Sequence, residues 1–219
     1  TVEDPIEYRL PGLTQVQVND KIELSLARVL RACLRQDPDV ILVGEIRDAE
    51  TADIALRAAI TGHLVLSSLH TKDALGAPFR LLDMGSPAFM VASSLQAVIA
   101  QRLVRANCEQ CKEPHVLSAQ ETAWMIATGG DDAAQEKTLR GRGCSACNGT
   151  GYHGRMGVYE LLEMDVDLAA AATHGDPNVF TRLAREKMRG HTMAHHALEL
   201  VRSGRTSVAE AMRLATDFD

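Results

Sequence analysis

Two short apolar runs with a helical stretch between them constrain this sequence most. Val40–Val43 is wholly apolar and rich in β-branched residues, which predicts a strand buried on both faces. Residues 49–61 have a helical pattern that Gly62 ends, and a second apolar strand is expected from residue 64 to residue 69. Strand, helix and strand at this spacing are the signature of a parallel βαβ unit. Residues 1–103 are therefore expected to form an α/β layer with a parallel sheet.

Helical patterns flank these two strands. Apolar residues at positions 26, 30, 33 and 34 form one stripe, and Asp37-Pro38-Asp39 ends this helix because proline disfavours helix before it. Arginines at positions 28, 31 and 35 share the opposite face, an arrangement more typical of an exposed helix face than of a binding site. Residues 72–84 and 87–103 are also expected to be helical, with Pro78 kinking or breaking the first of them.

Composition and charge exclude several classes of protein. With 219 residues and 46% hydrophobic content, the chain is sufficient for a folded domain with an appendage. A net charge of −6 and only 4% aromatic residues argue against a nucleic-acid partner, because nucleic-acid sites are basic and often stack bases on rings. The longest uncharged run, residues 84–101, contains proline, serine and glutamine, so no membrane span is expected. The first residues form no signal peptide, and the missing initiator Met predicts a chain that begins within a longer protein.

Four of the five cysteines form two CxxC pairs, Cys108 with Cys111 and Cys144 with Cys147. In a chain without a signal peptide, two such pairs predict four thiolates around a structural zinc ion rather than disulfides, and hence a reducing compartment. The alternative is a set of buried free thiols without metal. Cys33 lies on the apolar face of its helix and is expected to belong to the core.

Beyond residue 103 the pattern changes. Residues 104–162 are expected to form a zinc subdomain, in which Ser118 and Glu121 make a capping box at the start of a short helix carrying Trp124. A loop is expected at residues 129–132 and a strand at 158–162. Residues 163–219 are expected to be a helical subdomain, with helix starts at Asp176-Pro177 and at Ser207-x-x-Glu210.

Polar clusters stand at the ends of the strands expected in the first half. They are Glu3, Asp4 and Glu7 near the start, the segment 44–48 after the first apolar strand, and His63 and His70 on either side of the second. In open parallel sheets, ligands bind beyond the carboxyl ends of the strands. A carboxylate that follows a hydrophobic strand, here Glu45, resembles the Walker B element of P-loop nucleotide hydrolases. Each cluster alone also has a plainer interpretation: the carboxylates as a solvated turn, and the histidines as caps of a strand.

Three motifs in order resemble those of the type II secretion and type IV pilus assembly ATPases. Residues 1–7 (TVEDPIE) resemble the Asp box of this family, residues 34–48 (LRQDPDVILVGEIRD) its Walker B region, and residues 61–71 (TGHLVLSSLHT) its His box. Residues 80–85 and 100–103 continue the similarity, which covers essentially the whole chain. The four cysteines resemble those of the extension-type branch of the family. The motif sequences are most similar to mannose-sensitive-haemagglutinin pilus assembly ATPases, but they do not distinguish these from the secretion type.

The resemblance implies a RecA-like fold, of which this chain has the later strands, assembled as a homohexamer with ATP and Mg²⁺ between subunits. It also implies a cytoplasmic protein, peripheral to the bacterial inner membrane and bound to the platform proteins of a secretion or pilus machine. Carried over by motif, the implied catalytic residues are Glu3, which polarises the attacking water, Glu45, which acts around magnesium, and His70, which senses the γ-phosphate. Implied near the nucleotide or magnesium are Asp4, Glu7, His63 and Arg35, the last at a subunit boundary.

One family motif is missing from the sequence. The chain contains no GxxxxGK[ST] loop, whose backbone amides cradle the phosphates of the nucleotide. The chain is therefore expected to be the carboxyl-terminal part of a motor, with almost no hydrolysis on its own. Two alternatives are a non-enzymatic zinc-bearing module that docks on a membrane platform, and a zinc-ribbon nucleic-acid binder, which the charge disfavours.

Overall fold

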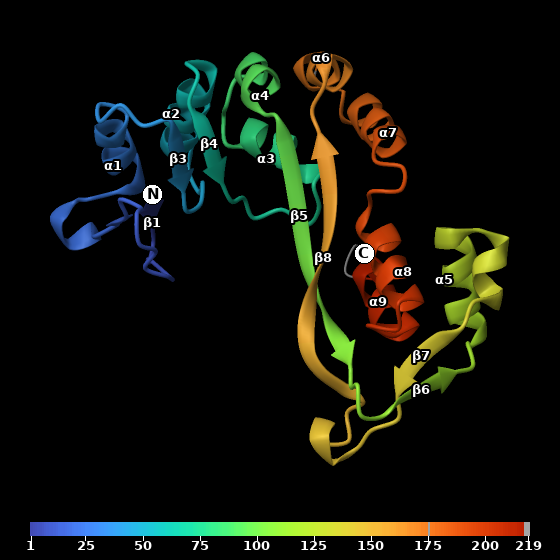
Figure 1. The fold of residues 1–219 in the computed structure, drawn as a ribbon. Coiled ribbons are helices and arrows are strands. Elements are labelled where there is room, and N and C mark those ends of the chain that lie inside the picture. Colours follow the sequence, from blue (N-terminus) through green and yellow to red (C-terminus); the bar gives the residue numbers. More distant parts are fainter. Residues whose placement is uncertain (175, 217–219) are drawn as a thin grey trace. The chain divides into compact units, whose positions relative to one another are not determined.

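The computed structural model describes residues 1–174 and 176–216 of the chain (Figure 1). It divides into two compact units, each described by itself below. Unit 1 comprises Thr1–Val98 and Leu162–Glu186, and unit 2 comprises Ile99–Leu161 and Lys187–Asp219. The division into domains at residues 103 and 162 that the sequence suggests stays a prediction. Residue 175 and residues 217–219, which fall in the expected helical subdomain, lie outside the described residues.

The sheet of unit 1 has four parallel strands in the order β2-β1-β3-β4. Val2 pairs with both Val16 and Val43, and Val43 pairs with Ser67, so the carboxyl ends of β1, β3 and β4 meet at one edge. The α/β class with a parallel sheet is therefore confirmed. The strand bounds are β1 Val2–Glu3, β2 Val16–Gln17, β3 Val40–Val43 and β4 Leu64–Ser67.

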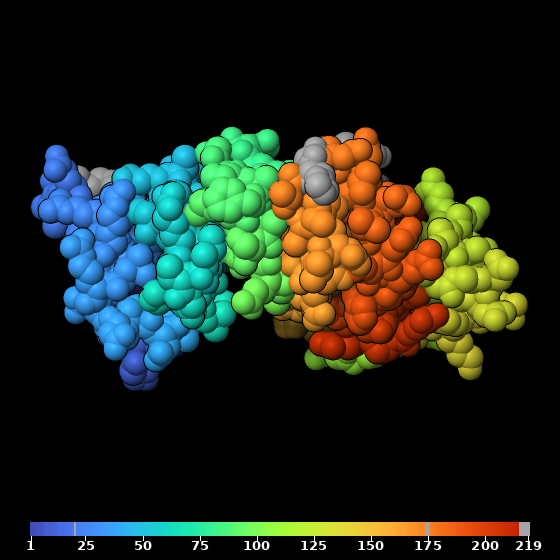
Figure 2. Space-filling view, turned by 90° about the horizontal axis from the view of Figure 1, so that it is seen from above, coloured from blue at the N-terminus to red at the C-terminus, as the bar shows by residue number. Residues whose placement is uncertain are grey.

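Six helices accompany this sheet among the described residues of unit 1. Ser25 and Asp48 cap the first two through their side chains, which accept from the backbone N–H groups of Arg28 and Thr51. The helix α4 packs beside α2, and their side chains form one continuous surface (Figure 2). Cys33 packs against the apolar core of this unit, as expected. The helix bounds are α1 Leu26–Cys33, α2 Ala49–Ile60, α3 Gly76–Asp83, α4 Ala88–Ser94, α6 Val166–His174 and α7 Pro177–Lys187.

Three expectations about unit 1 were wrong. The helix expected over 87–103 ends at Ser94, and Ala97–Asn107 is the long strand β5, which pairs with β8 (Tyr152–Glu163). Pro78 does not kink or interrupt a helix, because α3 begins only at Gly76 and proline is tolerated in the first turn. The strand β3 is not buried on both faces throughout, since Val40 is 57% exposed.

Unit 2 is built around two helices that follow each other, α8 (Met193–Arg202) and α9 (Val208–Thr216). Its apolar core includes Val104, Met125 and Val201. The expected capping box starts α5, where Ser118 and Glu121 bond reciprocally, and the expected helix start at Ser207 is also found, since its hydroxyl accepts the N–H of Glu210 at α9. The remaining elements of unit 2 are α5 Ala119–Gly129 and the antiparallel strands β6 Lys112–His115 and β7 Thr138–Gly141. Short 3₁₀ turns are η1 Asp20–Ile22 in unit 1, and η2 Asp131–Gln135 and η3 Ser145–Cys147 in unit 2.

No helix among residues 1–174 and 176–216 has the length and apolar character needed to cross a lipid bilayer.

Candidate functional site

Residues from all three family-like motifs meet at the carboxyl edge of the unit 1 sheet. Glu45 follows β3, and one of its carboxylate oxygens lies 3.1 Å from Nε2 of His70, which follows β4. The other oxygen accepts a hydrogen bond of 2.5 Å from Nη2 of Arg47. Nη1 of the same guanidinium lies 3.5 Å from a carboxylate oxygen of Asp4, which follows β1. The sheet therefore gathers two carboxylates, one guanidinium and one imidazole at a single edge.

Glu45 is held in its charged form. The hydrogen bond from Arg47 is the main cause that lowers the pKa of its carboxyl group, and the contact with His70 lowers it further against the opposing effect of burial. Its side chain is only 15% exposed, whereas the side chain of His70 is 83% exposed. The site thus offers a fixed carboxylate with an accessible histidine beside it, an arrangement suited to a metal ion and an anionic ligand.

Glu3 ends β1 and lies directly beside Gly44 of the neighbouring strand. The N–H of Gly44 donates to the carbonyl of Val2 at 2.7 Å, and a Cβ at Gly44 would lie 3.2 Å from both that carbonyl oxygen and Cα of Glu3. A hydroxyl hydrogen bond from Thr1 lowers the pKa of the Glu3 carboxyl, and the amide of Gln15, 3.0 Å away, lowers it further. Gly44 therefore lets the Asp-box and Walker-B segments approach closely.

Two of the sequence-predicted residues lie away from this edge. His63 precedes β4, so it lies at the amino-terminal edge of the sheet, where its Nδ1 is 3.0 Å from the carbonyl oxygen of Ala58 at the end of α2. Arg35 follows α1 and is exposed, with its Nε 3.5 Å from the carbonyl oxygen of Arg31. Glu7 is exposed in the loop after β1. His63 thus contacts the end of a helix, whereas the plainer interpretation from the sequence had it cap a strand.

Two residues whose side chains contact these carboxylates were missed by the sequence analysis, Arg47 and Gln15. Arg47 lay inside the quoted Walker-B segment without a role, and only the parallel register brings its guanidinium between Glu45 and Asp4. Gln15 opens the alternating run QVQV at 15–18, which was the available signal for a strand with one polar face. No pattern in the sequence pairs that strand with β1.

The four cysteines of the CxxC pairs form one cluster in unit 2. Their Sγ atoms all lie within 4.8 Å of one another, with separations of 3.8 Å for Cys108–Cys144, 3.9 Å for Cys111–Cys147 and 3.8 Å for Cys144–Cys147. These separations exceed a disulfide bond of about 2.05 Å. They match the edge of about 3.8 Å that four sulfurs make around tetrahedral zinc with bonds of about 2.3 Å. The donor set and its spacing therefore fit a zinc ion.

Backbone amides point at one sulfur of this cluster. Burial alone would raise the pKa of Cys147, yet hydrogen bonds from the N–H groups of Cys144 and Gly151, both 3.2 Å from Sγ, lower it to about 6. Burial raises the pKa of Cys111 to about 12. Gly151 is required for this arrangement, because a Cβ there would lie 2.3 Å from the carbonyl oxygen of Gly141. Amides directed at sulfur stabilise thiolate, the form that binds metal.

The chain is similar to secretion proteins over nearly all of its length. The sequence profile described as Type II/IV secretion system protein matches residues 1–213. Type II secretion system protein E of Pseudomonas aeruginosa is 46% identical over 217 residues, and that of Aeromonas hydrophila is 47% identical over 220 residues; each match covers 99% of this chain. The chain spans 42% of the length of these two relatives.

Solved structures show the same fold. The crystal structure of the pilus retraction motor PilT with bound ADP matches 97% of this chain and 51% of its own, with a TM-score of 0.67 and 29% identity. The ATPase DotB of Legionella pneumophila matches 99% of this chain and 50% of its own, with a TM-score of 0.66 and 23% identity, and supports the fold alone. The profile match over almost the whole chain shows that this protein belongs to the Type II/IV secretion system protein family.

Proposed function

We propose that this chain is the carboxyl-terminal part of a hexameric ATPase motor that hydrolyses ATP to drive type II protein secretion or type IV pilus assembly. The observation that carries the proposal is the meeting of Glu45, His70, Arg47 and Asp4 at the carboxyl edge of a parallel sheet. That edge is where open α/β sheets bind ligands. A RecA-like core is part of the proposal, with residues 1–103 as its later strands.

In this proposal the chain supplies groups that position water and metal. Glu3 is the catalytic carboxylate that orients the attacking water, and its lowered pKa keeps it charged at neutral pH. Carboxylate oxygens of Glu45 and Asp4 are the ligands that Mg²⁺ prefers. Magnesium, when bound, neutralises charge on the transferred phosphoryl group. His70 is exposed enough to reach the γ-phosphate.

Three further residues, Arg35, Glu7 and His63, enter the proposal through the family motifs. Arg35 would reach a nucleotide at a subunit boundary, which its exposure allows. Glu7 and His63 remain predictions from the motif, and His63 would need to act from the amino-terminal edge of the sheet. The parent protein would supply the phosphate-binding loop, since this sequence contains no GxxxxGK[ST] and spans 42% of its relatives. The chain alone would then hydrolyse almost no ATP.

The four cysteines would hold a structural zinc ion in a subdomain at 104–162, followed by helical residues 163–219. All four positions of the metal would be filled by sulfur, so it would cross-link the chain and take no part in hydrolysis. The motor would lie in the cytoplasm and meet the inner membrane through platform proteins.

The test uses the full-length parent protein. Replacing Glu45→Gln removes the charge near magnesium, and we expect kcat for ATP to fall by at least about a hundredfold. Glu50→Gln is the matched control, because Glu50 pairs with Arg31 on the surface of unit 1 and is 58% exposed. It should change kcat by less than about twofold, as surface ion pairs contribute little. A Glu45→Gln parent that still hydrolyses ATP normally would contradict the proposed role. A wild-type parent without ATP turnover would favour the docking module.

A further inference from the structure

Gln15 lies one residue before β2, on the strand face that also carries Glu3. In the parallel register Glu3 pairs with Gln17, and side chains two residues apart in a strand share a face. Gln15 and Gln17 therefore stand on one face beside Glu3. Gln15 is half-buried, whereas Gln17 is exposed.

The side-chain amide of Gln15 is held at three points. Its Nε2 donates to Oε1 of Glu3 at 3.0 Å and to the carbonyl of Tyr8 at 2.9 Å, and its Oε1 accepts the N–H of Leu10 at 2.8 Å. Both amide hydrogens are thus used, and the oxygen is engaged as well. Two of the three contacts are to backbone, so the amide has a fixed orientation relative to the carboxylate.

Among the described residues, the hydrogen bonds to the side chain of Glu3 all end on the same carboxylate oxygen. Oε1 accepts from Gln15 and from the hydroxyl of Thr1. Oε2 of Glu3 accepts no hydrogen bond from the residues that the structure describes. Anchoring a carboxylate by one oxygen leaves the second oxygen with a defined direction and free to receive a hydrogen bond from water.

We propose that Gln15 is a positioning residue for ATP hydrolysis: it fixes Oε1 of Glu3 so that Oε2 is presented to the attacking water. This inference rests on the proposed function, in which Glu3 orients that water. Phosphoryl transfer depends mainly on positioning and electrostatics, so the direction of the carboxylate governs the rate.

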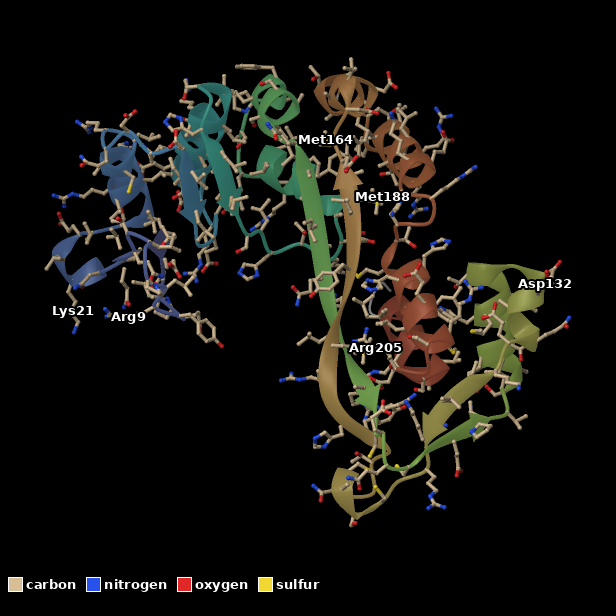
Figure 3. All side chains as sticks on the ribbon, viewed as in Figure 1. Arg9, Lys21, Asp132, Met164, Met188 and Arg205 are labelled. Carbon is tan, nitrogen blue, oxygen red and sulfur yellow. The ribbon has the colours of Figure 1, made fainter. Side chains whose placement is uncertain are left out.

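The loop between β1 and β2 belongs to the same arrangement. It contains Tyr8, which is 78% exposed, and Arg9, whose side chain is also exposed (Figure 3). Residues 7–14 are exposed, and backbone groups of two of them, the carbonyl of Tyr8 and the N–H of Leu10, hydrogen-bond the Gln15 amide. The loop therefore acts as the support on which the glutamine holds its orientation.

The test measures steady-state ATP hydrolysis by the full-length parent. Gln15→Ala is expected to lower kcat about ten- to a hundredfold, with the KM for ATP changed less than about twofold, because a carboxylate misplaced by about 1 Å costs rate rather than binding. Gln15→Met is the second variant, since it keeps the length of the side chain but none of its hydrogen bonds. Gln17→Ala is the matched control, because among the described residues the Gln17 side chain accepts the N–H of Ile6, at 3.4 Å, and makes no hydrogen bond to Glu3. It should retain wild-type kcat.

A double-mutant cycle separates positioning from a structural role. In Glu3→Asp the shorter side chain withdraws the carboxylate from Gln15, so adding Gln15→Ala should lower kcat by less than about twofold further. The inference would be overturned if the fold-losses in kcat of Glu3→Asp and Gln15→Ala multiplied in the double variant. It would also be overturned if Gln15→Ala and Gln15→Met had the same kcat as Gln17→Ala. If wild type is active and Glu45→Gln inactive, such a result leaves the proposed function standing. A wild-type parent without turnover would overturn both.

Discussion

Removing one of the four proposed zinc ligands should destabilise unit 2 strongly, and the perturbation we consider is Cys147→Ser. The buried cluster around Cys147 consists only of cysteines, so this knuckle has no apolar core of its own. Its Sγ–Sγ separations of 3.8–3.9 Å are those of a tetrahedral site. The metal is therefore expected to be what closes the loop between the two CxxC pairs.

The size of the effect follows from the length of that loop. The pairs Cys108–Cys144 and Cys111–Cys147, which a bound metal would cross-link, are each 36 residues apart. A cross-link over about 36 residues restricts the unfolded chain by about 4 kcal/mol at 25 °C. For a unit of this size, about 1 kcal/mol corresponds to roughly 4–8 °C. Loss of the site should therefore lower the melting temperature of unit 2 by roughly 15–30 °C.

The assay combines metal analysis with calorimetry on this chain. Freshly purified wild type should contain one zinc per chain, and Cys147→Ser much less, with the lowered melting temperature. Cys33→Ser is the matched control, because Cys33 is a half-buried free cysteine that packs against the core of unit 1 and belongs to neither CxxC pair. Less than half a zinc per wild-type chain, or equal melting temperatures for the two variants, would refute the reasoning and favour buried free thiols.

Two further predictions concern the two units separately. In unit 2, Glu210 is 3% exposed and burial opposes its charge, but the side chain and N–H of Arg105 lower its pKa below the ordinary 4.5. A carboxyl group with a lowered pKa in the folded state stabilises the fold above pH 4.5, and this stabilisation is lost as the pH falls through the folded-state pKa. Arg105→Met should therefore move the midpoint of acid unfolding, followed by circular dichroism, to higher pH. An unchanged acid midpoint would contradict this. In unit 1, Gly44→Ala would place a Cβ 3.2 Å from Cα of Glu3 and should lower ATP turnover of the parent at least about tenfold. Gly62→Ala should lower it less, because its Cβ meets no atom within 4 Å, although its positive φ makes the substitution strained. Equal turnover of the two glycine variants would contradict the close approach.

The sequence allowed the parts of the fold that depend on local chemistry to be predicted. The helix α2 ends just before Gly62 as expected, whereas α1 ends at Cys33, several residues before the expected stop at Pro38. The Ser118–Glu121 capping box and the Ser207 cap both start helices, because caps act within three residues. The CxxC pairs likewise indicated which sulfurs would meet. The strand β5 could not be predicted, since its β-branched Val98 and Ile99 follow a helical run directly and only its pairing with β8 decides between the two structures.

The candidate site shows the same limit at the level of single side chains. Glu45 and His70 were predicted because each follows a strand, and parallel strands end at one edge. His63 was grouped with His70 by motif, yet four strand residues lie between them and carry the two rings to opposite edges. The contacts of Arg47 and Gln15 could be predicted only with the register of β1 against β2 and β3, which is a long-range property of the fold.

The exposure of the site explains why its groups need further elements to work. His70 is 83% exposed and Arg47 is 56% exposed, so water surrounds the outer side of the Glu45 carboxylate. In water, charges about 4 Å apart interact with only about 1 kcal/mol, whereas near a protein surface the same pair gives about 4 kcal/mol. In the proposed motor, the electrostatic effect of these groups on a transition state therefore stays small until something excludes solvent. A phosphate-binding loop or a neighbouring subunit that covers this edge would raise each interaction without moving any of these side chains.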